Sequence, residues 1–162
     1  MNKYKGWLMP IAIALTCLVA LFSYKQANAA DLSVYMGGAS YHIGASDYTY
    51  KGETRDIQQV NPMIVVQYKQ MMVFGMKNSY HRTSLGLVWS PEHQVNDWFA
   101  VGVRLGLASG YSDTPIDRPV VPVVNPYMDF ALYSFHTQLG IMPSGTGDSK
   151  GIVTLNFKYD LF

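Results

Sequence analysis

The chain has 162 residues, of which 14% are charged, 14% are aromatic and 49% are hydrophobic, and its formal net charge is +1. Its mean hydropathy is only +0.04, so apolar residues must be interleaved with small and polar ones. This composition excludes an intrinsically disordered chain and a bundle of transmembrane helices.

The amino-terminal segment differs from the rest of the chain. Lys3 and Lys5 precede an uncharged run over residues 6–24, and Ala27-Asn28-Ala29 has the small residues of a cleavage site. This pattern predicts a secretory signal peptide over residues 1–29. The alternative is a single transmembrane anchor, because the run is near the lower length for spanning a bilayer.

Cleavage after residue 29 would remove the only cysteine and leave nine basic against 11 acidic residues, a formal charge of −2. We therefore expect no disulfide and no nucleic acid partner. The sequence has no GxGxxG motif, P-loop or zinc-ligand spacing, so we also expect no cofactor and no metal.

Residues 30–162 form the second predicted domain, which alternates apolar residues with small or polar ones and shows no helical periodicity. In chain order the predicted strands are Leu32–Ile43, Met63–Lys69, Met71–Asn78, Thr83–Ser90, Trp98–Ser109, Val120–Leu132, Phe135–Met142 and Ile152–Leu161. Alternation of this kind occurs in soluble sandwiches and in outer-membrane barrels. The signal peptide, the aromatic content and eight strands of about ten residues favour the barrel.

The sequence thus predicts an all-β protein, an eight-stranded antiparallel up-and-down transmembrane β-barrel, present as a monomer in the bacterial outer membrane. In its outer half the inward positions predict a narrow apolar acyl pocket. Its lining would be Met63, Val65, Gly86, Val88, Gly106, Ala108, Val121, Val123, Gly140 and Met142. In the periplasmic half we expect a hydrogen-bonded polar network, because buried charges need partners. Its members would be Gln67, Lys69, Arg104, Asp129, His136, Gln138, Lys158 and Asp160.

A polar cluster follows the third predicted strand. Since the strands run up and down, His42 should lie on the same rim as Asn78 and Ser79. An imidazole can take a proton from a hydroxyl, and donors can hold a developing oxyanion, so we assign these roles to His42 and to Asn78 with Ser79. Lys77 and Arg82 would hold headgroup phosphates. The alternatives are a solvent-exposed rim histidine and plain turn residues.

Six short segments, in a set order, carry a resemblance to a known family. They are SYH at Ser40–His42, Asn61-Pro62, MKNSY at Met76–Tyr80, the Gly-x-x-Trp of Gly86–Trp89, PVVPVVNPY at Pro119–Tyr127 and IMPSG at Ile141–Gly145. Nearly all of residues 30–162 resembles the lipid A palmitoyltransferase (PagP) family of eight-stranded outer-membrane acyltransferases. The resemblance implies transfer of a fatty acyl chain from a phospholipid donor to lipid A or a similar hydroxyl acceptor. It also implies that the family's functional histidine is His42 and its strand-end pair Asn78 and Ser79.

Two departures from the family pattern bear on activity. The best-known members have Asp where this chain has Asn78, and they begin with an amphipathic helix that is missing here. An amide can only hydrogen-bond, whereas a carboxylate stabilises a charged imidazole. Either His42 works with less help, or a loop acid, Asp47, Asp56 or Asp113, supplies the charge; His81 is the substitute base to test.

Prolines and the pocket floor add two expectations. Pro62, Pro122, Pro126 and Pro143 lack the ladder donor, and in the resembled family such gaps are lateral gates for lipid; the simpler reading is prolines at loop ends. Val88 replaces a small residue of the family at the pocket floor, which predicts an acyl chain shorter than palmitate.

A function from another class is a non-enzymatic small outer-membrane barrel with an adhesion, exclusion or structural role. Such a barrel should carry long aromatic or charged loops. The longest predicted loop, Gly44–Pro62, is mostly small and polar, which favours the acyltransferase.

Overall fold

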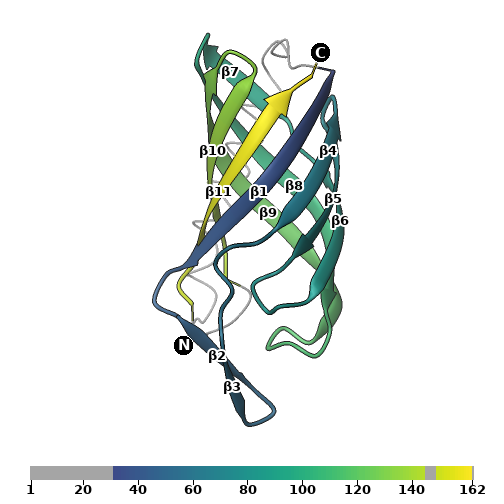
Figure 1. Cartoon of the computed structure of the whole chain (residues 1–162), viewed down its shortest axis with the longest axis vertical. Coiled ribbons are helices and arrows are strands. Elements are labelled where there is room, and N and C mark those ends of the chain that lie inside the picture. Colours follow the sequence, from purple (N-terminus) through teal and green to yellow (C-terminus); the bar gives the residue numbers. More distant parts are fainter. Residues whose placement is uncertain (1–30, 145–148, 162) are drawn as a thin grey trace, which may run out of the picture.

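The computed structural model describes residues 31–144 and 149–161, and in it eight antiparallel strands close into a barrel (Figure 1). The barrel strands are β1 Leu32–His42, β4 Met63–Tyr68, β5 Met71–Lys77, β6 Thr83–Trp89, β8 Phe99–Tyr111, β9 Arg118–Leu132, β10 Phe135–Met142 and β11 Ile152–Asp160. Pairing of β1 with β11 and of β6 with β8 closes the sheet. The predicted all-β, eight-stranded antiparallel barrel is confirmed.

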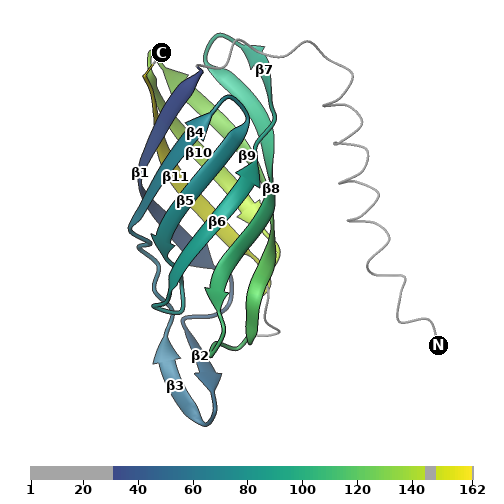
Figure 2. The same cartoon turned by 90° about the vertical axis from the view of Figure 1, so that its right-hand side faces the viewer.

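Three short strands were not predicted. β2 Asp47–Tyr50 and β3 Glu53–Asp56 form a hairpin that projects beyond one end of the barrel, and β7 Glu92–Asn96 lies at the other end (Figure 2). β7 pairs with the part of β8 that β6 does not reach, so it continues the line of β6. Because β7 lies between β6 and β8, the connection between these two barrel strands is longer than a tight turn.

The predicted signal peptide lies outside the described residues. Across residues 31–144 and 149–161, no helix has the length and apolar character needed to cross a membrane.

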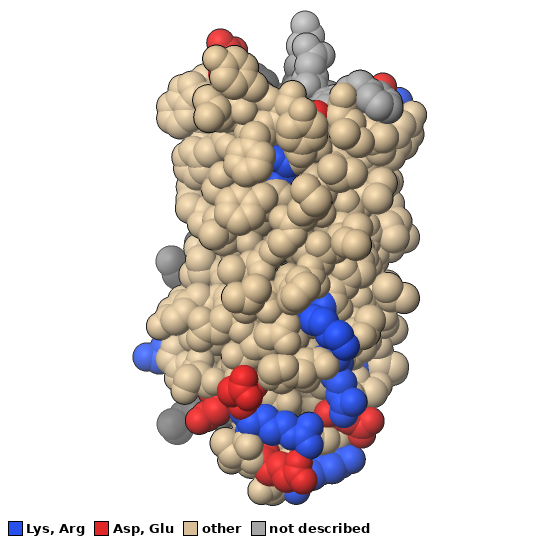
Figure 3. All heavy atoms as spheres, in the orientation of Figure 1, with Lys and Arg blue, Asp and Glu red and all other residues tan. Residues whose placement is uncertain are grey.

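Alternation along the strands separates the lumen from the outer wall. In β8, Ala100, Gly102 and Arg104 are buried while Leu107 points outward and is 58% exposed. Trp98 begins the predicted strand Trp98–Ser109, whose alternation places it on the inward face with Ala100 and Gly102. It is instead exposed, because it precedes β8 and packs on Phe99 and Phe130. On the face seen in Figure 3, charged side chains gather at the hairpin end and the wall above is almost free of them.

A β-bulge in β1 decides which of its side chains enter the lumen. Between the pairs Tyr35–Lys158 and Gly38–Asn156 the register slips by one residue, and Gly37 has a φ of 75°. The left-handed φ suits glycine because it has no Cβ, and a bulge moves later side chains to the other face. Tyr35 is therefore buried before the bulge and His42 after it.

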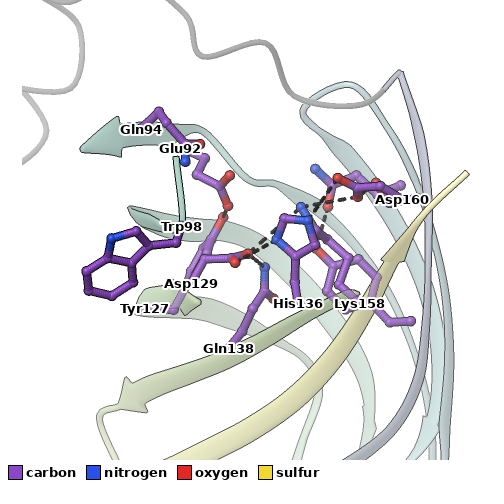
Figure 4. A network of polar contacts seen from close by, with 12 residues as sticks. Glu92, Gln94, Trp98, Tyr127, Asp129, His136, Gln138, Lys158 and Asp160 are labelled. Atoms are coloured by element: carbon purple, nitrogen blue, oxygen red, sulfur yellow. Dashed lines mark hydrogen bonds and ion pairs between the residues drawn. The ribbon is translucent and has the colours of Figure 1, made fainter. Parts of the chain in front are cut away.

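The end of the barrel opposite the hairpin is filled by a polar network (Figure 4). The two ring nitrogens of His136 lie 2.7 Å from an oxygen of Asp129 and 3.1 Å from an oxygen of Asp160. Lys158 Nζ lies 3.3 Å from Asp160 and 3.8 Å from Asp129. Both ring nitrogens of His136 face carboxylates, so we assign it as an imidazolium that donates to each.

Other predicted members of the network divide into two groups. Gln138 bonds to Arg104 and Asp129, and so belongs to the network, whereas Gln67 accepts from the hydroxyl of Tyr35 at 2.5 Å. Lys69 was placed wrongly, because it lies in the exposed turn after β4 with a φ of 53°.

The network generates a stability prediction. His136→Ala removes the closer of the two cations that Asp129 and Asp160 share and leaves them with Lys158 alone, so we expect the free energy of unfolding to fall by about 3 kcal/mol. Denaturant unfolding of the refolded barrel in detergent micelles measures this change. The matched control His81→Ala, at an exposed turn, should stay within about 0.5 kcal/mol of the wild type. Equal losses in the two variants would contradict the network.

Candidate active site

An apolar cavity of about 150 Å³ lies in the half of the barrel nearer the hairpin. Six predicted pocket residues line it: Met63, Val65, Val88, Ala108, Val123 and Met142. Val88 packs with Tyr35, Val65 and Met72 in one buried cluster at its base. The Arg104 guanidinium lines the same cavity and stacks on the ring of Tyr127, so the apolar space ends at the polar network.

Four predicted lining residues, Gly86, Gly106, Val121 and Gly140, do not line the cavity. At Gly86 the ring of Phe74 lies 2.3 Å from where a Cβ would stand, so this aromatic ring fills the space that the glycine leaves. At Gly140 the side chains of Asn125 and Thr154 do the same. The alternation correctly predicted that these positions face the lumen, but it did not predict which side chains of the neighbouring strands fill the space beside the glycines.

His42 and Ser79 meet at the mouth of the cavity. The Nε2 atom of His42, at the end of β1, lies 2.9 Å from Oγ of Ser79, in the turn after β5. His42 is only 3% exposed, so it is not a solvent-facing rim histidine, and Ser79 lines the cavity. The structure thus brings together two side chains 37 positions apart, as the up-and-down topology predicted.

Two further polar residues at the mouth were not assigned a role from the sequence. Ser40 Oγ donates to Asn61 Oδ1 at 2.7 Å and lies 3.2 Å from Ser79 Oγ. Both Ser40 and Asn61 line the cavity. Ser40 shares the face of His42 by the period of two along a strand, which is the signal that could have found it.

Asn78 lies apart from the imidazole and organises its own turn. Its amide nitrogen donates to Ser84 Oγ and to the Gly110 carbonyl, each at 2.9 Å, and its Oδ1 accepts from the backbone amides of Tyr80 and Arg82. It is fully buried. Because every donor and acceptor of the side chain is in use, Asn78 has none left for an oxyanion, and the turn-residue reading describes its contacts.

The loop acids do not support the histidine. Among the described residues, no carboxylate contacts His42: Asp113 pairs with Lys51 at 3.4 Å, and Asp56 with His81 at 3.5 Å. Asp47 is exposed on β2. His81 is also exposed and bonds to the backbone of Asp56, away from the cavity, so it is not placed to act as a base.

Tyrosine rings fix the loops around Ser79. Tyr80 contacts Tyr48 and Tyr111 edge-on, at centroid distances of 4.9 and 6.2 Å. These rings come from β2, from the turn after β5 and from the end of β8, and Ile57 packs with them. The Ser79 carbonyl accepts from the Gln58 amide at 2.9 Å, so the segment that carries the hydroxyl is held from both sides.

The predicted headgroup residues are exposed beside the mouth. Lys77, at the end of β5, bonds through Nζ to Thr83 Oγ1 at 3.1 Å. Arg82 is exposed in the same turn, and within the described residues its guanidinium has no partner. Both cations are therefore accessible to a phosphate.

Two of the proline positions border an interruption in the wall. The ladder between β9 and β10 ends at the pair Tyr127–Gly140, although β8 pairs with β9 as far as Arg118. Pro122 and Pro126 lie in the part of β9 beyond this end. Pro143 follows β10, as expected of a loop-end proline.

The barrel wall at Pro62 is not interrupted in this way, because backbone hydrogen bonds link the neighbouring strands there. Asn61 N donates to Gly38 O and Lys77 N donates to Pro62 O. The β9–β10 seam is thus the stronger candidate for lateral passage.

The sequence has a Gly-x-Ser-x-Gly spacing over residues 147–151, a pattern that also surrounds the nucleophile of many serine hydrolases. Ser149 is buried, and its hydroxyl donates to the Gly151 carbonyl at 2.9 Å. No imidazole contacts it among the described residues, so this serine is part of a turn. Nor do the described residues place three or more His, Cys, Asp or Glu side chains where they could hold a metal ion.

No protein-family model matches the chain, and no curated protein does either. The barrel and the geometry of its mouth are therefore the grounds for assigning a function. A buried imidazole, bonded to a serine at the opening of an apolar cavity, can move a proton beside a bound aliphatic chain.

Asn78 generates the second prediction. In Asn78→Asp a carboxylate oxygen replaces the donor that faces the Gly110 carbonyl, so we expect the unfolding free energy to fall by about 1–3 kcal/mol. Denaturant unfolding in micelles measures it. The control Asn96→Asp keeps an acceptor for the Trp98 amide at an exposed site and should be neutral. A more stable Asn78→Asp protein would contradict the turn role.

Proposed function

We propose that the chain is an outer-membrane lipid acyltransferase, which transfers a fatty acyl chain from a phospholipid to lipid A or a similar hydroxyl acceptor. The observation that carries the proposal is the buried His42–Ser79 contact at the mouth of an apolar cavity inside a closed barrel. The resemblance to the PagP family supports the same reaction, and β1 and the turn after β5 supply the two side chains.

Membrane placement is supported by the outer wall. Apolar side chains that point outward from neighbouring strands include Ile64, Val73, Leu85 and Ile141, each at least 60% exposed. An apolar band of this kind is typical of barrels embedded in lipid. Exposed aromatic residues gather where β1 begins and β11 ends: Tyr68, Trp98, Tyr133, Phe135 and Tyr159. Such a girdle marks a membrane interface, and the signal peptide predicted from the sequence fits the outer membrane.

The proposed reaction needs a base and a bound acyl chain. His42 takes the proton from the acceptor hydroxyl, whose oxygen attacks the donor ester carbonyl. The tetrahedral intermediate collapses, the glycerol oxygen leaves with the proton from the imidazolium, and the acyl chain is now joined to the acceptor. The Ser79 hydroxyl keeps the ring oriented while the acyl chain lies in the cavity. No cofactor takes part in this exchange of esters.

Lipid access follows from two features of the wall. Lys77 and Arg82 stand at the rim, where they can pair with headgroup phosphates. The part of β9 that precedes Tyr127 pairs with β8 but not with β10, and this interruption offers a lateral path from the bilayer to the cavity. We expect the barrel to act as a monomer.

The size of the cavity indicates a short acyl chain. Its 150 Å³ is below the range of roughly 300–1,000 Å³ that is usual for ligand pockets. Val88 and Tyr35 close its base, and Met63, Met72 and Met76 line it with flexible side chains that adapt to a ligand.

The loop hairpin favours the second candidate function, a non-enzymatic binding barrel. β2 and β3 project beyond the mouth, and Arg55 pairs with Glu53 on the exposed hairpin. A charged, protruding hairpin is a feature of barrels that act through their loops. It does not explain a buried imidazole below the hairpin.

The acyltransferase is tested in cells that express the barrel. Mass spectrometry of lipid A should show an added acyl chain with the wild type, and about 100-fold less or none with His42→Ala, because general-base catalysis contributes roughly 10²–10⁴-fold. Ser79→Ala should also lower it. Folded barrel is quantified by its shifted gel mobility without heating.

His81→Ala is the matched control and should retain the modification. An added chain that persists in both His42→Ala and Ser79→Ala would remove this site assignment. Unmodified lipid A with a folded wild type would favour the binding barrel.

Chain length is tested at the cavity base. Val88→Ala enlarges the space beside Met72 and should shift the transferred chain to a longer one, read as a mass increase on lipid A. Leu107→Ala, on the outer wall, is the control and should leave the mass unchanged. An unchanged mass with Val88→Ala would show that Val88 does not set the length.

A further inference from the structure

We propose that Asn61 and Ser40 are positioning residues that hold the imidazole of His42 in the tautomer protonated on Nε2, so that Nδ1 carries the basic lone pair. The tautomer follows from hydrogen-bond geometry alone. Only its role in catalysis rests on the proposed function.

Asn61 is the fixed end of the chain of hydrogen bonds. It is 3% exposed, and its amide nitrogen faces two backbone carbonyls, of Lys77 at 3.2 Å and Gln58 at 3.4 Å. Turning the amide over would set its oxygen against both carbonyls and leave buried groups unsatisfied. The oxygen Oδ1 of Asn61 must therefore face Ser40, where it can only accept.

The hydrogen bond from Ser40 to Asn61 determines how Ser40 can bond to Ser79. A serine hydroxyl has one hydrogen, and that of Ser40 is given to Asn61 Oδ1 at 2.7 Å. Toward Ser79, whose Oγ is 3.2 Å away, Ser40 can then act only as acceptor. The hydroxyl of Ser79 therefore donates to Ser40.

Ser79 also has a single hydroxyl hydrogen, and this fixes its hydrogen bond to the imidazole of His42. Its single hydrogen is directed to Ser40, so its oxygen can only accept from His42 Nε2, 2.9 Å away. Nε2 thus carries the proton. Within residues 31–144 and 149–161, Nδ1 of His42 has no hydrogen-bond partner.

The competing arrangement is less favourable. If Ser79 donated to Nε2, the oxygens of Ser40 and Ser79 would face each other at 3.2 Å with no hydrogen between them. That loses one hydrogen bond in a partly buried site, which costs on the order of 1 kcal/mol. The direction set by Asn61 therefore decides the tautomer.

This chain of hydrogen bonds, a relay from Asn61 through Ser40 and Ser79 to His42, identifies Nδ1 of His42 as the atom that accepts the proton. The hydroxyl O–H bond of the acceptor breaks and an N–H bond forms at Nδ1, which creates an imidazolium that still donates from Nε2 to Ser79. The acceptor oxygen bonds to the acyl carbon, the donor C–O bond breaks, and the leaving oxygen takes the proton back from Nδ1.

Nitrogen-15 NMR of the imidazoles tests the inference without any substrate. Protein labelled at histidine is refolded in micelles at a pH where His42 is neutral, and its signals are identified by their loss in His42→Gln. Long-range proton–nitrogen spectra should show the Nε2–H pattern in the wild type. In Ser40→Ala, Ser79 loses its acceptor and donates to Nε2, so the pattern should move to Nδ1–H.

Two controls separate this effect from a general disturbance. Ser40→Thr keeps the hydroxyl and should restore the Nε2–H pattern. Ser109→Ala removes a hydroxyl that bonds only to Leu85 and should leave the spectrum unchanged. An Nδ1–H pattern in the wild type, or an Nε2–H pattern that persists in folded Ser40→Ala, would overturn the relay. Should Ser40→Ala not fold, the wild-type pattern and that of Ser40→Cys, whose sulfur is only a weak acceptor for Ser79, decide in the same way.

The lipid A assay separates the two proposals. In Ser40→Ala we expect at least a tenfold loss of acyl transfer, because the lone pair moves to the other ring nitrogen. A tautomer switch with unmodified lipid A in the wild type would overturn the acyltransferase and support the relay.

Discussion

The extra residue at Gly37 decides which side chains in the second half of β1 face the lumen. Without it, strict alternation from Tyr35 would turn Tyr41 inward and place His42 on the outer wall of the barrel. With it, Ser40 and His42 share the inner face, within hydrogen-bond reach of the turn after β5. One backbone irregularity therefore creates the polar mouth, and all the chemistry proposed for the barrel depends on it.

The lumen below that mouth is divided by depth, and each part has its own physical role. Paired charges around His136 join three strands, β9, β10 and β11, at one end of the barrel. Above them, Tyr35 and Val88 form a dry floor, and methionines leave adaptable space. The reactive groups lie where this apolar space meets the loops, so a bound chain and a hydroxyl can reach the same imidazole.

Alternation predicted the eight barrel strands because successive residues of a barrel strand face the lumen and the outer wall in turn. It missed β2, β3 and β7, which are short and lie outside that environment. The His42–Ser79 contact was predicted from topology, since alternate strand ends share a rim. The partners of Asn78 could not be predicted, because they come from Ser84 and the Gly110 backbone through tertiary packing. The filling of the space at Gly86 by Phe74 depends on a rotamer that no sequence pattern encodes.

The polar network at the closed end also bears on permeability. Asp129 and Gln138 are almost wholly inaccessible, and Arg104 stacks on Tyr127 of the adjacent strand β9 inside the lumen. Ions or small solutes would have to displace these paired groups to pass, at a large electrostatic cost. The barrel is thus closed at this end, so the proposed membrane location would not make it a pore for ions or small solutes.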